Sequence, residues 1–324
     1  MNTASRIIEY ITQHGQASGK EITDFLGTIG SRGVRKQLKS LLDRGKLQKV
    51  GKPPKVYYLI SLQKFEPETT EVNSATEKII NERYLYVTPS GVSKPGWSGF
   101  IDWCAKTHQD PVKTAEEYIN TIKKYDQFKK NGLINGLPKI NKTFDRIWLD
   151  YLFYIDFYSI ERFGKTKLGQ ILLYAKQSQN IALIRQLIRD IHPAITTYIT
   201  KYNIDGVLFI PPTVKREIQL MKMLESGLQL PIRKLSVAKI RTDIVVPQKT
   251  LSKLEDRVEN ASHTIIVEDV NHYNNILIID DAVGSGATLN ETAKQIRNKK
   301  LTKGLIIGLA ITGSYKGFDV ISEV

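Results

Sequence analysis

The sequence contains very little cysteine and no long apolar run. A single cysteine, Cys104, in 324 residues excludes an internal disulfide framework and a zinc site built from several cysteines. No stretch of about 18 uninterrupted apolar residues is present to span a bilayer, and residues 1–5 lack the layout of a signal peptide. We therefore expect a cytoplasmic protein with no membrane partner.

Acidic residues are scarce relative to basic ones, and the imbalance is uneven along the chain. The net charge is +14, and residues 1–60 contain eleven Lys and Arg residues against four Asp and Glu residues, which gives this segment +7. Half of the excess charge therefore lies in less than a fifth of the chain. Such a segment favours a polyanionic partner, although a basic surface kept for solubility is the alternative.

Residues 1–61 have the patterns of three short helices followed by two strands. We expect a helix ending near His14, a helix from the capping box of Ser18 and Glu21 to Leu26, a helix capped by Ser31 that runs to Asp43, and strands at 47–50 and 56–59. Helices followed by a hairpin in this order are typical of a winged helix-turn-helix domain. In that fold the third helix enters the DNA major groove and the hairpin lies on the phosphate backbone.

The third helix and the hairpin tip carry the basic side chains that DNA contact would require. We predict that DNA or another nucleic acid binds Arg32, Arg35, Lys36, Lys39, Lys52 and Lys55. The alternatives are a solvated basic face or a protein-docking surface, because winged helices also serve as interaction modules. The sequence does not indicate which bases are read.

Residues 62–145 carry no recognisable chemistry. Residues 61–80 are polar with little periodicity, as expected of a linker. Aromatic and aliphatic residues then recur at helical spacing, at Tyr118, Ile122 and Tyr125 and again at Trp148, Leu152 and Ile155. We predict a linker and helical connector over 62–145, with these side chains in a core.

The most informative segment begins at residue 276. Four apolar residues, Ile276 to Ile279, are suited to a buried parallel strand, and two acids, two small apolar residues and a Gly-Ser-Gly turn follow before a helix from Leu289 to Arg297. A strand that leads through a glycine-rich turn into a helix N-terminus forms a phosphate cradle, because backbone N–H groups and the helix dipole favour an anion. The turn is neither a Walker A loop nor a dinucleotide-binding turn, since the required lysine and glycine spacing are absent.

The two acids, Asp280 and Asp281, require a separate explanation, because a phosphate site would avoid them. We expect them to accept hydrogen bonds from vicinal ribose hydroxyls and to favour a Mg²⁺ ion that the ligand's diphosphate holds, with no direct metal ligand from the protein. The phosphate is expected on Val283, Gly284, Ser285, Gly286, Ala287 and Thr288. An ordinary strand, turn and helix with acidic caps is the alternative.

This segment resembles the signature of the type I phosphoribosyltransferases, an apolar strand followed by two acids, two variable residues and a Thr/Ser/Gly-rich loop. Residues 276–288 fit it, with Gly284-Ser285 where Thr-Thr is usual. The resemblance implies 5-phosphoribosyl-1-diphosphate (PRPP) or another 5-phosphoribosyl ligand, with Mg²⁺. It also implies an α/β fold with a parallel sheet flanked by helices over residues 146–324, behind the winged helix and the helical connector. A homodimer is a candidate assembly.

The resemblance assigns two further segments. The family's second loop holds the diphosphate, and the corresponding residues after the strand 207–210 are Pro211, Pro212, Thr213, Lys215 and Arg216. Lys239, Arg241, Gln248, Leu251, Arg257 and Asn260 are spaced as in the ComF subfamily, in which this segment closes over PRPP. Lys239 stands where that subfamily has arginine, and its cysteine-rich zinc ribbon is absent. The expected catalytic residues are Asp280, Asp281, Lys239 and Arg241.

The resemblance implies a transfer reaction in which a nitrogen nucleophile displaces diphosphate from C1 of PRPP. The protein would mainly position groups and neutralise the departing charge. A winged helix joined to such a domain is also the architecture of the purine repressor of Gram-positive bacteria, which senses PRPP without turning it over. A nucleic-acid-controlled effector of a defence system is a third interpretation. The sequence identifies no acceptor.

Overall fold

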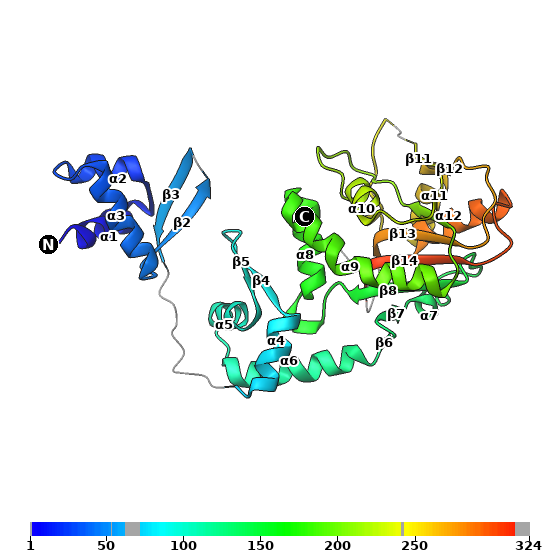
Figure 1. Cartoon of the computed structure of the whole chain (residues 1–324), viewed down its shortest axis with the longest axis horizontal. Coiled ribbons are helices and arrows are strands. Elements are labelled where there is room, and N and C mark those ends of the chain that lie inside the picture. The colour runs from blue at the N-terminus through cyan, green and yellow to red at the C-terminus, as the bar shows by residue number, and fades with distance from the viewer. Residues whose placement is uncertain (1, 53, 62–71, 241–242, 315–324) are drawn as a thin grey trace.

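The computed structural model describes residues 2–52, 54–61, 72–240 and 243–314, and among these the side chains of residues 51, 52, 55 and 249 are outside the description. The described chain is an α/β protein (Figure 1). A unit of helices and a small sheet comes first, then a helical region, and then a large sheet with helices on both faces.

The described part of residues 2–61 forms three helices and a three-stranded antiparallel sheet of order β1-β3-β2. The elements are α1 (Thr3–His14), β1 (Gln16–Ser18), α2 (Gly19–Leu26), α3 (Ser31–Asp43), β2 (Leu47–Lys52) and β3 (Lys55–Ile60). The three helices and the hairpin confirm the expected order, whereas the short β1 is not anticipated by the sequence. The helices and strands together enclose a core of Ile7, Ile11, Ala17, Ile22, Leu26, Val34, Leu38, Leu41 and Leu47.

Capping residues determine where two of these helices begin. The Glu21 N–H donates to Ser18 Oγ at 3.2 Å and the Ser18 N–H donates to Glu21 Oε2 at 2.7 Å, which confirms the predicted capping box. The prediction that Ser31 caps α3 is wrong. Gly30 takes the N-cap position with extended backbone and no side-chain hydrogen bond, and Ser31 is the first helical residue.

Residues 72–145 are more structured than a connector requires. Their elements are α4 (Ser74–Arg83), β4 (Leu85–Val87), β5 (Ser93–Pro95), α5 (Gly96–Lys106), α6 (Pro111–Asp126), β6 (Lys129–Lys130), β7 (Leu133–Asn135) and α7 (Leu137–Ile140). Tyr118, Ile122 and Tyr125 are buried on α6, as predicted. Their cluster continues into the core of the large sheet, so the helical region and the sheet share one hydrophobic interior.

Among the described residues, seven strands form one sheet of order β10-β9-β13-β14-β8-β7-β6. Its remaining strands are β8 (Tyr151–Phe157), β9 (Gly206–Phe209), β10 (Arg233–Lys234), β13 (Ile276–Val283) and β14 (Ile306–Gly313). The first five strands in the order are parallel, and β7 and β6 are antiparallel additions. The sheet thus includes residues 129–130 and 133–135 from the segment expected to be a connector.

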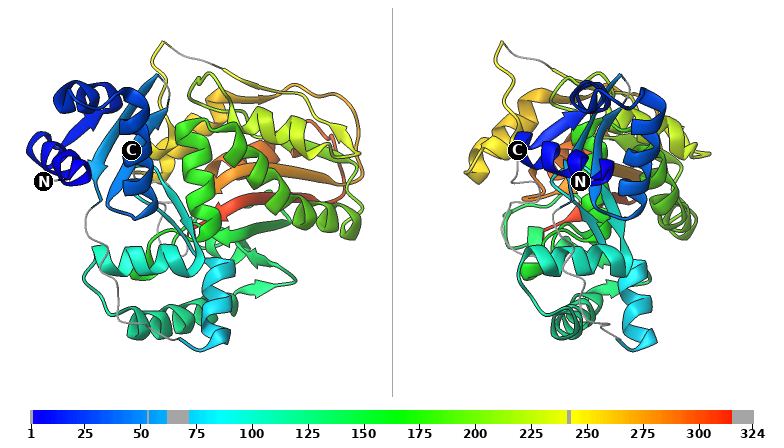
Figure 2. Two further views of the ribbon diagram at one scale, coloured as in Figure 1. Left: turned by 60° about the vertical axis from the view of Figure 1, so that its left-hand side comes forward. Right: turned by 90° about the vertical axis from the view of Figure 1, so that its left-hand side faces the viewer.

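Helices cover both faces of this sheet (Figure 2). The remaining elements are η1 (Glu161–Phe163), α8 (Lys167–Ser178), α9 (Ile181–Lys201), α10 (Leu220–Leu228), β11 (Val237–Lys239), η2 (Gln248–Thr250), α11 (Leu254–Thr264), β12 (Ile265–Val267) and α12 (Ala287–Asn298). Side chains of α8, α9 and α10 pack on one face, and those of α12 and α6 belong to the cluster on the other. No helix of the described ranges is long and apolar enough to cross a membrane.

The helical spacing expected at Trp148, Leu152 and Ile155 is wrong, because residues 151–157 form the strand β8. In this strand Leu152 and Phe153 point into the two different hydrophobic clusters on either side of the sheet. A strand buried on both faces is apolar at nearly every position. Such a run therefore also satisfies a helical repeat by coincidence.

Candidate ligand-binding site

The predicted loops meet at the carboxyl ends of two neighbouring parallel strands, β9 and β13. The Ile210 N–H, directly after β9, donates to the Ile279 carbonyl at 2.9 Å and holds the two strand ends together. A cavity of about 540 Å³ lies beyond this edge. In open α/β sheets, ligands bind outside the carboxyl ends of the strands. The position and size of the cavity therefore identify it as the candidate site.

The turn between β13 and α12 is tighter than the sequence predicts. β13 continues through both acids to Val283 and α12 begins at Ala287, so residues 284–286 make the whole turn. Gly286 has a φ of 88°, and a Cβ at this residue would lie 2.6 Å from Cγ2 of Ile140. Both the conformation and the contact require glycine. Residues 282–289 line a small recess of about 70 Å³ beside the larger cavity.

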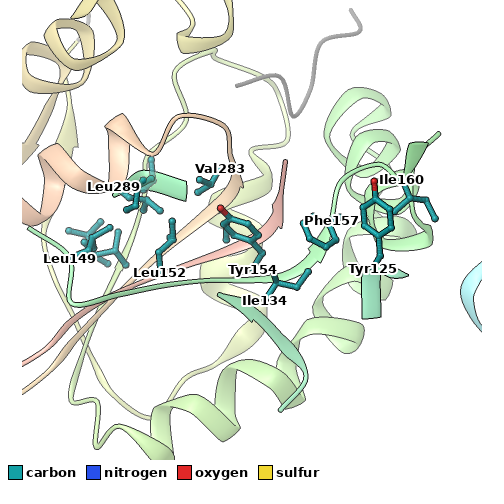
Figure 3. Close-up of a cluster of buried hydrophobic side chains, with 14 of the residues drawn as sticks. Tyr125, Ile134, Leu149, Leu152, Tyr154, Phe157, Ile160, Val283 and Leu289 are labelled. Carbon is teal, nitrogen blue, oxygen red and sulfur yellow. The ribbon is translucent and has the colours of Figure 1, made fainter. Parts of the chain in front are cut away.

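The predicted phosphate residues contribute to this turn in different ways. Figure 3 shows Val283 beside Leu289 and Tyr154 in the apolar cluster, so its side chain belongs to the core. Ser285 is buried, and its Oγ accepts the Ala287 N–H at 3.3 Å. The larger cavity is lined by Gly284 and Thr288. Gln248, Arg257 and Asp280 complete the lining of the recess, so a cation adjoins the glycine turn.

Both predicted acids line the cavity. The Asp281 carboxylate forms an ion pair with Lys176, and the Asp281 N–H donates to Asp280 Oδ1 at 2.8 Å. Burial, and then the charge of Asp281, raise the pKa of Asp280. The Asp281 N–H, Lys176 and Lys239 lower this pKa, but their combined effect is smaller. Asp280 is therefore a carboxyl group whose ionised form gains from any additional cation or hydrogen-bond donor in the cavity.

The carboxyl end of α8 contributes cavity residues that the sequence analysis misses. Lys176 and Gln177 line the cavity, and the Lys176 carbonyl and Gln177 Oε1 accept Nη1 and Nη2 of Arg216 at 3.1 and 3.4 Å. Gln179 Oε1 accepts the Ile218 N–H at 2.7 Å. Lys176 lies 105 residues before the acid that it contacts. No local pattern connects the two, and only the fold brings them together.

The predicted diphosphate loop follows β9 and is only partly directed at the cavity. Pro211, Pro212, Thr213 and Arg216 line it. Lys215 is exposed and is not among the lining residues. The loop's cation at the cavity wall is therefore Arg216, which the end of α8 holds in place.

Lys239 of the predicted lid lies at the cavity, on β11. This strand pairs with β12, and the Lys239 ammonium donates to Thr264 Oγ1 at 2.6 Å. Burial lowers the pKa of Lys239, and the charge of Asp280 opposes that shift. Arg241, the other predicted cation of this segment, lies outside the described residues.

The polar residues spaced as in ComF form one hydrogen-bonded network. Gln248 Nε2 donates to the Arg257 carbonyl at 2.8 Å and to Asn260 Oδ1 at 3.2 Å. Arg257 Nε donates to the Leu251 carbonyl at 2.7 Å. Gln248 and Arg257 also line the cavity, so the network joins the predicted lid to α11 and to the site.

The predicted nucleic-acid residues lie in the N-terminal unit. Arg32, Arg35, Lys36 and Lys39 are exposed on α3, whose opposite face is buried in the core of that unit. The side chains of Lys52 and Lys55 are outside the described ones, although both residues lie in the hairpin strands. Four cations on one helix face provide a continuous basic surface.

No protein-family model matches the chain, and no curated protein is significantly similar to it. The resemblance to phosphoribosyltransferases therefore depends on the residues of 276–288 and on the segments that surround the cavity. In the structure, the predicted order of a strand, two acids, a glycine turn and a helix lies at the carboxyl edge of the parallel strands.

Proposed function

We propose that the cavity binds PRPP with Mg²⁺ and that the α/β unit has the type I phosphoribosyltransferase fold. The convergence of the β13 acids, the glycine turn and the loop after β9 on one cavity carries this proposal. The recess at the turn adjoins the N-terminus of α12, which suits a phosphate group, the two acids suit ribose hydroxyls, and Arg216 suits the diphosphate. A volume of about 540 Å³ is within the usual range for a small-molecule site.

The charges around the cavity also favour an anionic ligand. Its described lining includes four cations, Lys176, Arg216, Lys239 and Arg257, and two acids, Asp280 and Asp281. An excess of positive charge at partly buried positions attracts a polyanion more strongly than the same charge on an open surface. A site for phosphate alone would not need the two acids, and hydrogen bonds to the ribose hydroxyls would explain their presence.

Two carboxylates suit a metal ion that arrives with its ligand. Within the described ranges, no group of three or more His, Cys, Asp or Glu side chains is close enough to hold a metal. Asp280 and Asp281 would face a Mg²⁺ ion that the diphosphate coordinates, and this ion would neutralise charge on the leaving group. The same two side chains would orient the ribose.

The proposed reaction is displacement at C1 of PRPP. The bond from C1 to the diphosphate oxygen breaks, a bond forms between C1 and a nitrogen of the acceptor, and that nitrogen releases its proton. Arg216 and Lys239 steady the departing diphosphate, since both line the cavity and both keep their positions through hydrogen bonds. Such a transition state requires positioning and charge more than a protein nucleophile.

A PRPP-sensing regulator is the second candidate function, and a nucleic-acid-controlled effector would use the same two sites. The exposed basic face of α3 favours a link to nucleic acid. We propose that residues 2–61 form a winged helix-turn-helix domain whose α3 enters the major groove. In a regulator, PRPP would change DNA affinity without being consumed.

Two measurements on the full chain test these proposals. Isothermal titration calorimetry with PRPP and Mg²⁺ is expected to show binding. If no binding is detected, the proposed site is overturned. Diphosphate release in the presence of mixed nucleobases and nucleotides would identify a transferase. Binding without release, together with a PRPP-dependent change in DNA affinity, would identify a regulator.

A further inference from the structure

Lys176 lines the cavity but is not among the residues that the resemblance to phosphoribosyltransferases assigns to the site. It lies in the last turn of α8, and its ammonium pairs with the Asp281 carboxylate in the cavity wall. The Lys176 side chain is 33% exposed and that of Asp281 is 13% exposed. Water screens a pair at this depth less than it screens a fully exposed surface pair.

The backbone around Lys176 is fixed in two directions. Arg216 of the loop after β9 donates to the Lys176 carbonyl and to Gln177, and the backbone of the same loop donates to Gln179. The Lys176 side chain pairs with Asp281 of β13, which lines the same cavity. One helix end therefore contacts both the proposed diphosphate loop and the proposed ribose acids, and places an ammonium group beside Asp281.

We propose that Lys176 is a built-in cation of the site that takes over part of the charge neutralisation otherwise supplied by Mg²⁺. This inference rests on the proposed function. A bound diphosphate brings several negative charges next to two carboxylates, and the site must offset them. Because Asp281 is already paired with an ammonium, part of that offset is present before any metal arrives. Lys176 is thus a positioning residue for Asp281 and a specificity residue for a polyanion.

The Mg²⁺ dependence of PRPP binding distinguishes this electrostatic role of Lys176 from a purely structural role. The affinity for PRPP is measured by calorimetry on the full chain, in EDTA and at saturating Mg²⁺. The variants are Lys176→Met, Lys176→Arg and the control Lys234→Met, which removes a lysine paired with Glu225 outside the cavity lining. Thermal unfolding confirms that each variant is folded, and Lys176→Gln replaces Lys176→Met if the latter is not.

Lys176→Met is expected to weaken PRPP binding about tenfold or more in EDTA and clearly less at saturating Mg²⁺, because the metal compensates for the lost charge. Lys176→Arg should keep most of the metal-free affinity, and Lys234→Met should match the unmodified chain. If Lys176→Met loses the same PRPP affinity in EDTA and in Mg²⁺, or loses none, the inference about Lys176 is overturned. The proposed function is still upheld in that case, provided that the unmodified chain binds PRPP. If the unmodified chain binds no PRPP at any Mg²⁺ concentration, the proposed function itself fails.

Discussion

The molecule presents positive charge in two different ways. On α3, four cations lie within eight residues of sequence and all are exposed. Around the cavity, Lys176, Arg216, Lys239 and Arg257 come from four separate segments, and each is at least partly buried. Three of these four have side-chain contacts of 2.6 to 3.4 Å that fix their position.

The degree of burial of the cations determines what each surface can recognise. Exposed cations keep their water and contact a long polyanion by counterion release, so their binding is steeply salt-dependent. Partly buried and hydrogen-bonded cations have lost water and conformational freedom before the ligand arrives, so they select a small anion by its shape. We therefore expect substitutions at one site to leave ligand binding at the other unchanged.

The largest expected effect is at the cavity. Replacing both acids, in Asp280→Asn with Asp281→Asn, should weaken PRPP binding by about 100-fold or more, because the two charge-assisted hydrogen bonds that we propose to ribose would be lost. Calorimetry measures this change, and Glu268→Gln is the control, since Glu268 is exposed and outside the lining. DNA affinity should stay the same. Unaltered PRPP affinity would exclude the ribose assignment.

The next effect tests whether the glycine turn depends on packing as well as on backbone conformation. Gly286→Ala is expected to destabilise the fold by roughly 2 kcal/mol more than Gly132→Ala. Both residues have positive φ, but a Cβ at Gly286 meets Ile140 at 2.6 Å and one at Gly132 meets nothing within 4 Å. Urea unfolding of the two variants gives the comparison. Equal losses would mean that the contact with Ile140 is readily relieved.

A smaller effect is expected on the basic face. Removing three cations of α3, in Arg35→Ala, Lys36→Ala and Lys39→Ala together, should weaken DNA binding about tenfold and reduce its salt slope by about 2 to 3. Fluorescence anisotropy over a range of salt concentrations measures both quantities.

The matched control for that variant removes the same charge elsewhere. Lys123, Lys142 and Lys299 are exposed and lie outside the N-terminal unit, and their replacement by alanine lowers the net charge equally. This control should leave the salt slope almost unchanged. If it weakens DNA binding as much as the α3 variant does, the total charge of the chain is responsible and α3 is not a specific surface.

The sequence predicts local features of this molecule well. The capping box at Ser18 and the helices of the N-terminal unit follow from spacing alone, and the order of strand, acids, turn and helix after residue 276 is also correct. The sequence does not predict correctly where β13 ends, because whether the two acids continue the strand depends on pairing with β14. A local pattern can indicate a strand but does not fix where its hydrogen bonding ends.

The parts that could not be predicted depend on long-range contacts. The ion pair between Lys176 and Asp281 joins two segments that share no sequence pattern. Similarly, β7 belongs to the sheet through its antiparallel pairing with β8, which no local pattern predicts. The exposed position of Lys215 beside the lining residue Arg216 is set by contacts of the loop with α8. Neighbouring cations look equivalent in a sequence, and only tertiary contacts separate them.

The smallest effect concerns the stability of the ligand-free cavity. Burial and the neighbouring carboxylate raise the pKa of Asp280 above its unfolded value, so this group stabilises the fold at low pH. That contribution is complete below the unfolded pKa and is lost as the pH rises through the folded one. Asp280→Asn should therefore increase stability at neutral and alkaline pH, by on the order of 1 kcal/mol, and change little near pH 4 or below.

Thermal unfolding at several pH values, without ligand, measures this difference, and the data at the acidic end serve as the internal control. A variant that is less stable than the unmodified chain at neutral pH would contradict the prediction. It would mean that Lys176 and Lys239 stabilise the ionised Asp280 by more than burial destabilises it. The cavity would then be charge-balanced before a ligand binds and would resemble the solvated face of α3 more closely than its burial suggests. If the prediction holds, ionised Asp280 carries a free-energy cost in the ligand-free cavity, and this cost distinguishes the cavity from the solvated face of α3.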